Sequence, residues 1–364
     1  MRILILSVDF PPHCDGVSTV SHHYARRLAE LGHDVHALGP AAAGDAEFDA
    51  TVPFGVTRFR GYDLGVLRFF PFVLQALRAI RHHRPDVIFA MNIGYGGVLC
   101  RFMKVPYVTM AYAYEFLKFA GTPLHRLYLS IYERSRMTIA ITRFTADQLA
   151  AFGVHGDSIK IVNPGVVGAP IAPSAITNDA TRPFRLGTCG RVIRRKGHDT
   201  VLRALPAIIE KVPDVEYVVA GDGPNRVALD ALAAELGVES HVTFLGRVSD
   251  AELAAFYASL DLFVMPSRHD EATGHVEGFG IVYLEAALQG VPSIGSRTGG
   301  VPEAILDGET GLLVPPESPD ALAEAVISLA RDSGRRIALG EAAQERVRNE
   351  FNWDRLVEQV EGLL

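Results

Sequence analysis

A short basic segment in the second half of the sequence has residue types that bind anions. Gly190 precedes Arg191, and a run of basic residues ends at Lys196. Glycine allows a tight turn, so the guanidinium of Arg191 and the ammonium of Lys196 can converge on one group. A planar guanidinium, which can form two parallel hydrogen bonds, and a compact ammonium charge together suit a diphosphate. An ordinary solvated basic turn is the alternative interpretation.

A glycine-rich segment further along the chain carries two glutamates, Glu277 and Glu285. The sequence Phe279-Gly280-Ile281 predicts the start of a helix near Gly280, where free N–H groups and the helix dipole attract an anion. Glu277 then lies in the loop, and Glu285 lies about a turn and a half inside the helix. A carboxylate there can accept hydrogen bonds from two vicinal hydroxyls, as a ribose offers. The alternative interpretation is that Glu285 is an ordinary carboxylate on the surface of the helix.

These segments, and a third glycine-rich one at 296–303, each follow an apolar run that we interpret as a strand. Ligands of open α/β sheets bind at the carboxyl ends of the strands. We therefore expect the basic turn and the two glutamates to form one site. The third segment either shapes the wall of a cleft or makes a tight turn.

The elements that must position these residues form two similar series. Apolar runs such as Arg2–Val8 and Asp34–Leu38 alternate with amphipathic segments such as Val17–Leu31. A second series begins at Phe184–Thr188 and continues with Val215–Ala220. Continuous apolar strands joined by helices predict parallel sheets that are buried on both faces. The predicted fold class is α/β, with two doubly wound Rossmann-like domains facing each other across a cleft.

A change in composition divides these two series. We expect an N-terminal Rossmann-like domain at 1–168 and a linker rich in Gly, Pro and Ala at 169–183. The second domain is expected at 184–350, and a final helix at 351–364.

Composition and targeting signals limit the class of protein. Hydrophobic residues make up 48% and charged residues 21% of the chain, which fits a globular fold. Cys14, Cys100 and Cys189 match no metal or redox motif. We find no signal peptide and no apolar stretch near the ~20 residues that span a bilayer. We expect a cytoplasmic protein without a nucleic-acid partner.

One stretch of the first half combines basic and apolar residues. Residues 57–85 contain six arginines and one acid, Asp63, with the apolar run Phe69–Leu74 among them. Such a stretch can lie against an anionic membrane, which would place the protein at the inner membrane face. A core helix with an arginine face is the alternative.

Six motifs in a fixed order give the second half a resemblance to a known family. They are Gly190-Arg191 with Lys196-Gly197, Ala220-Gly221-Asp222-Gly223-Pro224, Gly246-Arg247-Val248, Glu277-Gly278-Phe279-Gly280 with Glu285-Ala286, Gly299-Gly300-Val301-Pro302-Glu303, and Asp307-Gly308-Glu309-Thr310-Gly311. The order of these motifs closely resembles glycosyltransferase family 4. Within that family, the phosphatidylinositol mannosyltransferases are the most similar subgroup.

The resemblance implies a GT-B fold and a retaining, metal-independent transfer of a hexose from a UDP- or GDP-linked sugar. The acceptor would be a glycan or a lipid-linked molecule, and no cofactor would be needed besides the donor. Arg191 and Lys196 would hold the diphosphate, Glu285 the ribose, and Glu277 the donor sugar. The backbone of Arg247 and Val248 would meet the base. The final helix would cross back to the first domain.

Two positions of the first half depart from the family pattern. Gly16 stands where many relatives have a pair of glycines, although it still allows close approach of a ligand to the backbone. Tyr112 stands where relatives often have a histidine that contacts the donor sugar. Tyrosine can form hydrogen bonds but does not titrate near neutrality. We therefore expect a reshaped sugar pocket, with an inactive enzyme as the alternative.

Other classes of function fit the sequence less well. The chain has no Asp-x-Asp motif, and Asp270, Glu271 and His275 lack the spacing that would fix a metal site. The sequence Gly221-Asp222-Gly223 lacks the third glycine of a dinucleotide fingerprint. A non-catalytic binding subunit and a sugar-nucleotide epimerase of the same architecture stay open as alternatives.

Overall fold

The structure is a computed structural model, and the residues that it describes are 1–12, 16–112, 114–168, 182–270 and 274–364. They form two compact units. The first comprises Met1–Pro164 together with Trp353–Leu364, and the second comprises Gly165–Asn352. Of the expected linker, residues 169–181 lie outside the described residues.

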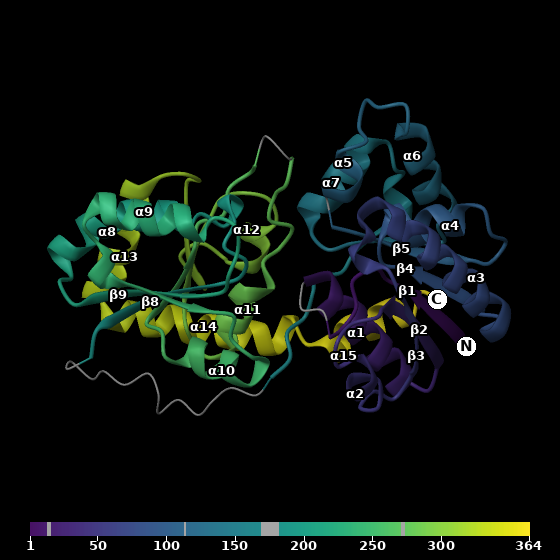
Figure 1. The fold of residues 1–364 in the computed structure, drawn as a ribbon. Helices are drawn as coiled ribbons and strands as arrows, with labels where there is room; N and C mark the ends of the chain where they lie inside the picture. Colours follow the sequence, from purple (N-terminus) through teal and green to yellow (C-terminus); the bar gives the residue numbers. More distant parts are fainter. Residues whose placement is uncertain (13–15, 113, 169–181, 271–273) are drawn as a thin grey trace. The chain divides into compact units, whose positions relative to one another are not determined.

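The first unit is built on a seven-stranded sheet in the order β3-β2-β1-β4-β5-β6-β7 (Figure 1). The strands are β1 (Arg2–Leu6), β2 (Asp34–Pro40), β3 (Gly55–Phe59), β4 (Val87–Ala90), β5 (Tyr107–Ala111), β6 (Met137–Ala140) and β7 (Ile159–Ile161). All neighbouring strands run parallel. The strand order reverses between β1 and β4, so the carboxyl ends of these two strands form the switch point where such sheets bind ligands.

Helices cover both faces of this sheet. They are α1 (Gly16–Glu30), α2 (Asp45–Asp49), the 3-10 segment η1 (Tyr62–Arg68), α3 (Phe69–His83), the π-helical turn η2 (Ile93–Gly97), α4 (Val98–Arg101), α5 (Tyr114–Leu117), α6 (His125–Arg134), α7 (Arg143–Phe152) and the 3-10 turn η3 (Gly156–Ser158). Phe89 of β4 packs on Tyr24 of α1, with ring centroids 5.9 Å apart. Its neighbour Ile88 joins a core with Phe72 and Ala76 of α3. Side chains alternate between the faces of a strand, so both faces are buried.

The second unit has a six-stranded parallel sheet in the order β10-β9-β8-β11-β12-β13. The strands are β8 (Phe184–Cys189), β9 (Val215–Ala220), β10 (Val242–Gly246), β11 (Leu262–Met265), β12 (Ser293–Ser296) and β13 (Gly311–Val314). Here the order reverses between β8 and β11. The carboxyl ends of β8 and β11 are therefore the switch point of this sheet.

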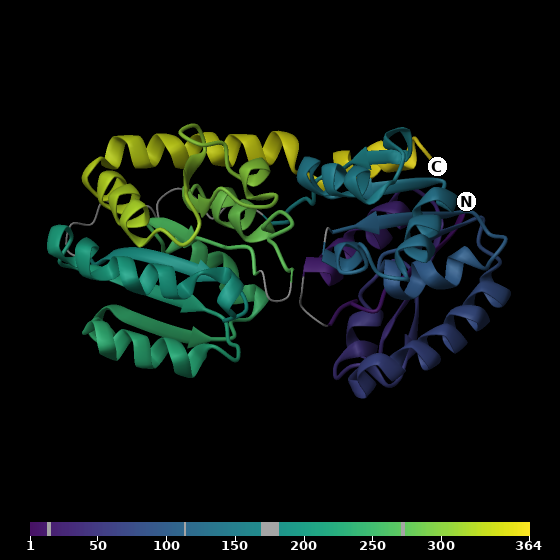
Figure 2. The ribbon, with the colours of Figure 1, turned by 90° about the horizontal axis from the view of Figure 1, so that it is seen from above.

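The helices of the second unit also form two layers (Figure 2). They are η5 (Arg194–Lys196), α8 (His198–Lys211), α9 (Arg226–Leu236), η6 (Glu239–His241), α10 (Asp250–Ala258), α11 (Ile281–Leu288), α12 (Val301–Ala304), α13 (Pro319–Arg331) and α14 (Ser333–Glu350). Val264 of β11 joins the core that α8, α9 and α13 cover. Phe263 packs instead on Tyr257 of α10 and Tyr283 of α11. Again, both faces of the sheet are buried.

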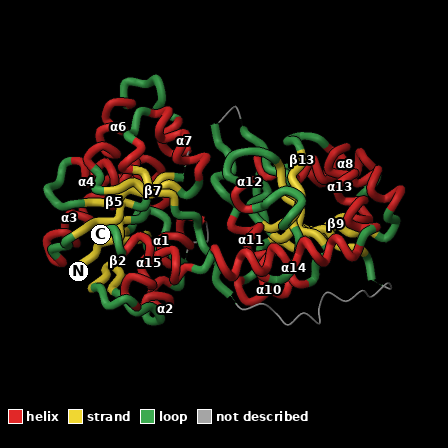
Figure 3. Tube along the Cα trace, turned by 180° about the vertical axis from the view of Figure 1, so that it is seen from behind, coloured by secondary structure: helices red, strands yellow, loops and turns green. Residues whose placement is uncertain are grey.

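The last helix, α15 (Trp353–Glu361), belongs to the first unit, although α14 before it belongs to the second (Figure 3). Trp353 stacks on His23 of α1 with ring centroids 4.9 Å apart. Arg27 of α1 donates to Glu358 at 3.0 Å. Apolar contacts and ion pairs thus join α1 and α15, which lie far apart in the sequence.

Two strands were not predicted from the sequence. Both β3 and β13 are edge strands, and β3 buries only Phe59 fully. The partly exposed β3 lacks the continuous apolar signal of a central strand, whereas β13 is apolar and mostly buried but has only four residues. The arginine-rich stretch 57–85 therefore contains the end of β3, η1 and α3 rather than one helix.

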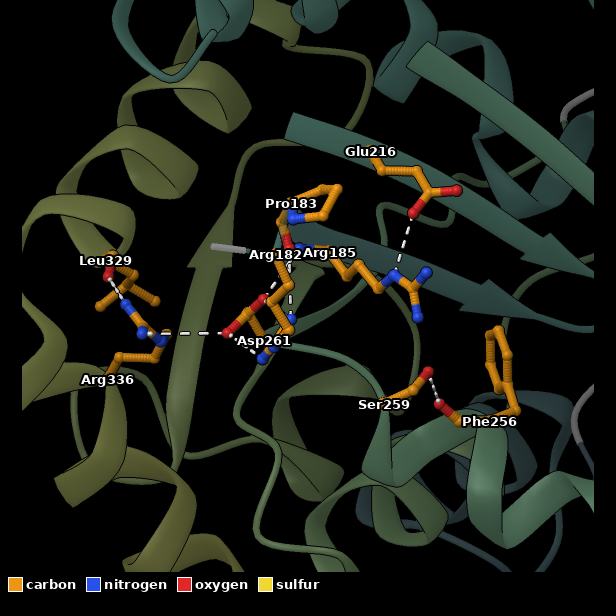
Figure 4. Close-up of polar contacts among 9 residues, drawn as sticks. All are labelled: Arg182, Pro183, Arg185, Glu216, Phe256, Ser259, Asp261, Leu329 and Arg336. Carbon is orange, nitrogen blue, oxygen red and sulfur yellow. Dashed lines mark hydrogen bonds and ion pairs between the residues drawn. The ribbon is translucent and has the colours of Figure 1, made fainter. Parts of the chain in front are cut away.

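A buried aspartate links the amino ends of β8 and β11 to α14 (Figure 4). Asp261 is 7% exposed and accepts two hydrogen bonds from Arg182, at 2.8 and 2.9 Å. It also accepts from the Arg185 N–H at 2.8 Å and lies 3.9 Å from Arg336. One carboxylate therefore pairs with two guanidinium groups.

Replacement of Asp261 with alanine is expected to lower the free energy of unfolding by about 3–5 kcal/mol, because it removes the counter-ion of the buried Arg336 and the half-buried Arg182. Urea denaturation measures this loss. The control is Glu216→Ala, which removes the more exposed pair with Arg185 and is expected to cost at most about 1 kcal/mol. An equally small effect of both variants would contradict the structural role of Asp261.

Candidate functional site

The basic turn and the first glutamate meet at the switch point of the second unit. The Lys196 ammonium donates to Glu277 Oε2 at 2.8 Å, and Arg195 Nη1 donates to the same oxygen at 2.7 Å. Lys196 also lies beside Gly190, because a Cβ added to that glycine would be 3.7 Å from Lys196 Cε. Two cations and one carboxylate thus form a cluster with an excess of positive charge.

The cluster keeps Glu277 ionised. Burial alone would raise the pKa of this carboxyl, which is 8% exposed. The charges of Lys196 and Arg195, and their hydrogen bonds, outweigh burial and lower the pKa to about 2. Glu277 is therefore an acceptor, not an acid, at neutral pH.

The turn is held by contacts with the loop after β11. Gly197 has φ +75°, and a Cβ there would be 2.1 Å from the Pro266 carbonyl oxygen, so no larger residue fits. The Arg268 N–H donates to the Arg195 carbonyl at 2.9 Å. The Arg268 guanidinium is bound by Asp199, and by Glu317 at 2.7 Å. Backbone and side-chain contacts thus fix the position of Lys196.

The third glycine-rich segment supports the Glu277 loop from behind. The Gly300 N–H donates to the Glu277 carbonyl at 2.9 Å. A Cβ on Gly299, which has φ +55°, would be 2.2 Å from the same oxygen. Of the two interpretations of residues 296–303, the structure shows a tight turn that cradles the backbone of Glu277.

The second glutamate lies on α11 and is oriented by a buried tyrosine. The Tyr257 hydroxyl donates to Glu285 Oε2 at 2.6 Å. Burial and the charge of Glu285 raise the pKa of Tyr257 far above its usual value, so the hydroxyl stays protonated and donates. Burial raises the pKa of Cys189 to about 11, and the charges of Glu285 and Lys196 both act on this thiol. Glu285 therefore lies close to the end of β8 and to the basic turn.

The other site residues predicted in this unit occupy less central positions. Arg191 is exposed at the start of the turn, and Arg247 is exposed after β10 with Val248 half-buried beside it. Gly280 has φ +93° and precedes Ile281, the first residue of α11. Phe279 is 2% exposed and packs on Phe351, so only its backbone is available to a ligand.

A polar cluster occupies the switch point of the first unit. Asp9 follows β1 and Asn92 follows β4, and Asn92 Nδ2 donates to Asp9 Oδ2 at 3.1 Å. The Tyr62 hydroxyl donates to Asp9 Oδ1 at 3.2 Å. Arg68 Nε donates to the Tyr95 hydroxyl at 2.7 Å, and its guanidinium lies 5.0 Å from the Tyr62 ring centroid. Carboxylate, amide, hydroxyl and guanidinium groups together can recognise a hydroxylated or phosphorylated ligand.

The two predicted site residues of the first unit lie near the ends of other elements. Gly16 is the first residue of α1, and a Cβ added there would meet nothing within 4 Å. Tyr112 follows β5, and its N–H donates to Glu115 Oε1 at 2.6 Å. Of the residues considered as metal ligands, Glu271 lies outside the described residues.

The sequence interpretation missed Arg195 as a partner of Glu277, and it missed Tyr257 and the Asp9–Asn92 pair entirely. Asp9 and Asn92 follow predicted strands, so the rule that identified the basic turn could also have found them. Tyr257 lies inside a helix, and nothing in the sequence connects it with Glu285.

Family models and solved structures agree with this architecture. Residues 174–346 match the model for glycosyl transferases group 1, and residues 14–167 match that for Glycosyltransferase Family 4. Sucrose-phosphate synthase from Thermosynechococcus elongatus aligns with a TM-score of 0.82 and 22% identity over 100% of this chain and 98% of its own. Anabaena HepE, solved with UDP-glucose, aligns with a TM-score of 0.82 and 21% identity, again over 100% of this chain and 98% of its own. Two parallel Rossmann-like sheets of this kind define a GT-B protein.

A relative from Mycobacterium tuberculosis is 31% identical, with 100% of this chain and 98% of the relative covered. Its name is GDP-mannose-dependent alpha-(1-6)-phosphatidylinositol monomannoside mannosyltransferase. The chain belongs to glycosyltransferase family 4 and is a hexosyltransferase. The predicted family, fold class and enzyme class are confirmed.

Proposed function

We propose that this protein transfers a mannosyl residue from GDP-mannose to a hydroxyl group of a lipid-linked or glycan acceptor, with retention of configuration and without a metal ion. The 31% identical relative supports the choice of donor by its name. The bond between the sugar C1 and the diphosphate breaks, a bond to the acceptor oxygen forms, and the proton of the acceptor hydroxyl passes to the departing diphosphate.

The observation that carries this proposal is the cluster of Lys196, Arg195 and Glu277 beside Glu285. Departure of the diphosphate builds negative charge, and cations fixed in advance stabilise that charge more in the transition state than in the ground state. Glu285 can accept hydrogen bonds from the ribose, and Glu277 from the donor sugar. Arg191 is proposed to reach the diphosphate from the edge of the turn.

The first unit is proposed to hold the acceptor. Asp9 and Asn92 offer hydrogen-bond acceptors and a donor at the switch point, and Arg68 offers a cation. This set suits a polyhydroxylated headgroup that carries a phosphate. Gly16 and Tyr112 are proposed to contribute at the same end of the sheet.

A thermal-shift panel tests the choice of donor. GDP and GDP-mannose should raise the melting temperature more than UDP and UDP-glucose, because a ligand that binds only the folded state stabilises it. Release of GDP in the presence of an acceptor then tests transfer. If no nucleotide shifts the melting temperature and no GDP is released, the protein is a non-catalytic relative and the proposal fails.

Removal of divalent ions is expected to leave turnover unchanged, because Lys196 and Arg195 supply the charge that a metal would otherwise provide at the diphosphate. The measurement compares GDP release with and without EDTA. Restoration of lost activity by added Mg²⁺ or Mn²⁺ would contradict a metal-independent mechanism.

Tyr257→Phe is expected to raise the KM for the donor about tenfold, which corresponds to the loss of one hydrogen bond to a charged group. The phenyl ring retains the packing on Phe263, whereas Glu285 loses its fixed orientation. Steady-state kinetics should show a smaller change in kcat. The opposite pattern, a lower kcat with an unchanged KM, would contradict a role for Tyr257 in ribose binding.

A further inference from the structure

A buried histidine at the end of the basic turn belongs to a chain of hydrogen bonds. His198 is the first residue of α8, two positions after Lys196, and is 2% exposed. Its Nδ1 lies 3.0 Å from the Tyr217 hydroxyl, which lies 2.9 Å from Thr188 Oγ1. The Thr188 hydroxyl donates to the Val264 carbonyl. The chain of hydrogen bonds therefore links the end of the turn to β9, β8 and β11, at the switch point.

The direction of these hydrogen bonds decides which ring nitrogen carries the proton. A carbonyl oxygen only accepts, so the proton of Thr188 points to Val264 and its oxygen accepts from Tyr217. The Tyr217 oxygen then accepts from the ring, because its one proton is already used. Burial raises the pKa of Tyr217 above its usual value, so this hydroxyl keeps its proton. A neutral His198 is therefore protonated at Nδ1, and Nε2 keeps a lone pair.

The second ring nitrogen lacks a hydrogen bond in this neutral form. Nε2 of His198 is buried and has no hydrogen-bond partner among the described residues. The backbone of Arg191 lies close enough to the ring to favour its protonated form, as a carbonyl acceptor does. Arg191 is near the start of the basic turn and His198 follows its end. A proton on Nε2 would let the ring donate to that carbonyl and so join the two ends of the turn.

Burial and charge keep the ring neutral in the protein by itself. Burial lowers the pKa of His198 to about 4, the Arg191 backbone opposes this effect, and the charge of Lys196 adds to it. The charge of Asp199 favours protonation, but Asp199 is paired with the guanidinium of Arg268. A diphosphate bound to Lys196 would offset the positive charge that opposes protonation of the ring.

We propose that donor binding adds a proton to His198: as the diphosphate reaches the basic turn, Nε2 takes a proton from the solvent and donates to the Arg191 carbonyl. Nδ1 continues to donate to Tyr217, so both nitrogens of the imidazolium are paired. The ring then closes the turn and adds positive charge to it. The proton returns to the solvent when the nucleoside diphosphate leaves. This inference rests on the proposed function, since it places the diphosphate of the donor at Lys196.

Isothermal titration calorimetry with GDP-mannose tests the proposal. Titrations in buffers that differ in ionisation enthalpy measure the protons that the protein takes up on binding. The diphosphate of GDP-mannose is a diester without a proton that titrates near neutrality, unlike the terminal phosphate of GDP. The parent protein should take up protons, and its affinity should rise as the pH falls, by at most about tenfold per pH unit for one proton.

Two variants remove the coupling in different ways. His198→Gln should bind GDP-mannose without proton uptake and with little dependence on pH, because an amide does not titrate. Tyr217→Phe keeps the histidine but removes the oxygen that holds the proton on Nδ1. The neutral ring can then carry its single proton on Nε2 and donate to Arg191, so proton uptake should be lost in this variant as well.

Matched controls make the same changes away from the turn. His241 is half-buried at the opposite end of the same sheet, with Nδ1 2.8 Å from the Val215 carbonyl. Tyr107 is a buried strand residue of the first unit, and its hydroxyl donates to the Ile131 carbonyl at 2.7 Å. His241→Gln and Tyr107→Phe should take up protons like the parent protein.

Two results would overturn this inference alone. They are binding of GDP-mannose to the parent protein without proton uptake, and an uptake that His198→Gln retains in full. Absence of any binding would overturn the proposed donor together with the inference, so failure of the proposed function is distinguishable from failure of the proton coupling.

Discussion

Lys196→Ala is expected to lower turnover by roughly 10²–10³, the scale of losing one preorganised group that stabilises developing charge. The ammonium lies 2.8 Å from Glu277 at the switch point, where the diphosphate of the donor is proposed to bind. Its removal leaves Arg195 as the remaining cation on that carboxylate. Because the charge develops in the transition state, kcat should fall more than the affinity for the donor.

Two variants of the same turn separate this effect from a general loss of basic charge. Arg194 is exposed in the turn, so Arg194→Ala should retain activity close to that of the parent. Arg191→Ala should resemble Lys196→Ala if its guanidinium reaches the diphosphate. Turnover of Lys196→Ala within threefold of the parent would remove Lys196 from the mechanism.

Glu277→Gln is the second substitution with a large expected effect, a fall in turnover of roughly 10²-fold. Glutamine keeps the size of the side chain but removes the charge that holds Arg195 and Lys196. It also removes a carboxylate oxygen from the proposed sugar site. Steady-state kinetics of GDP release measure the effect, and unchanged kinetics would contradict any contact between Glu277 and the donor.

The acid stability of the same variant checks the electrostatic origin of this effect. The pKa of Glu277 in the folded protein is about 2, below its ordinary value of 4.5. The stabilisation that comes from its ionisation is therefore complete above pH 4.5 and is lost as the pH falls towards 2. The parent protein should lose stability over this range more steeply than Glu277→Gln. Parallel stability curves for the two proteins would show that the charge of Glu277 is not held by the cluster.

Much of the fold is predictable from the sequence because its signals are local. The buried strands β4 and β11 are continuous apolar runs and β1 is one after Arg2, and Gly190 and Gly221 mark the turns that follow β8 and β9. The edge strand β3 escapes prediction because exposure interrupts its apolar pattern, whereas β13 is apolar and mostly buried but only four residues long. The same local signals identify Lys196 and Glu277 as loop residues that follow strands, and Glu285 as a residue in the second turn of a helix.

Other features of the site depend on segments that are distant in the sequence. Tyr257 on α10 and Glu285 on α11 meet because both helices pack on one face of the sheet, where Phe263 contacts Tyr257 and Tyr283. Asp9 and Asn92 meet because β1 and β4 are neighbours. The sequence can place Asp9 and Asn92 after strands, but their pairing depends on the order of strands in the sheet, and the pairing of Tyr257 with Glu285 depends on helix packing.

The sequence by itself determined the family, the two α/β series and the residue types that suit a diphosphate and its sugars. Only the tertiary structure decided that Arg195 is the second cation on Glu277, and that Gly299 and Gly300 support the Glu277 loop. The physical reason is that residue types are read directly from the sequence, and that turn formation depends on neighbours in the chain. The direction of a side chain in a turn depends instead on the packing around it, here on Pro266 and Arg268 of another loop.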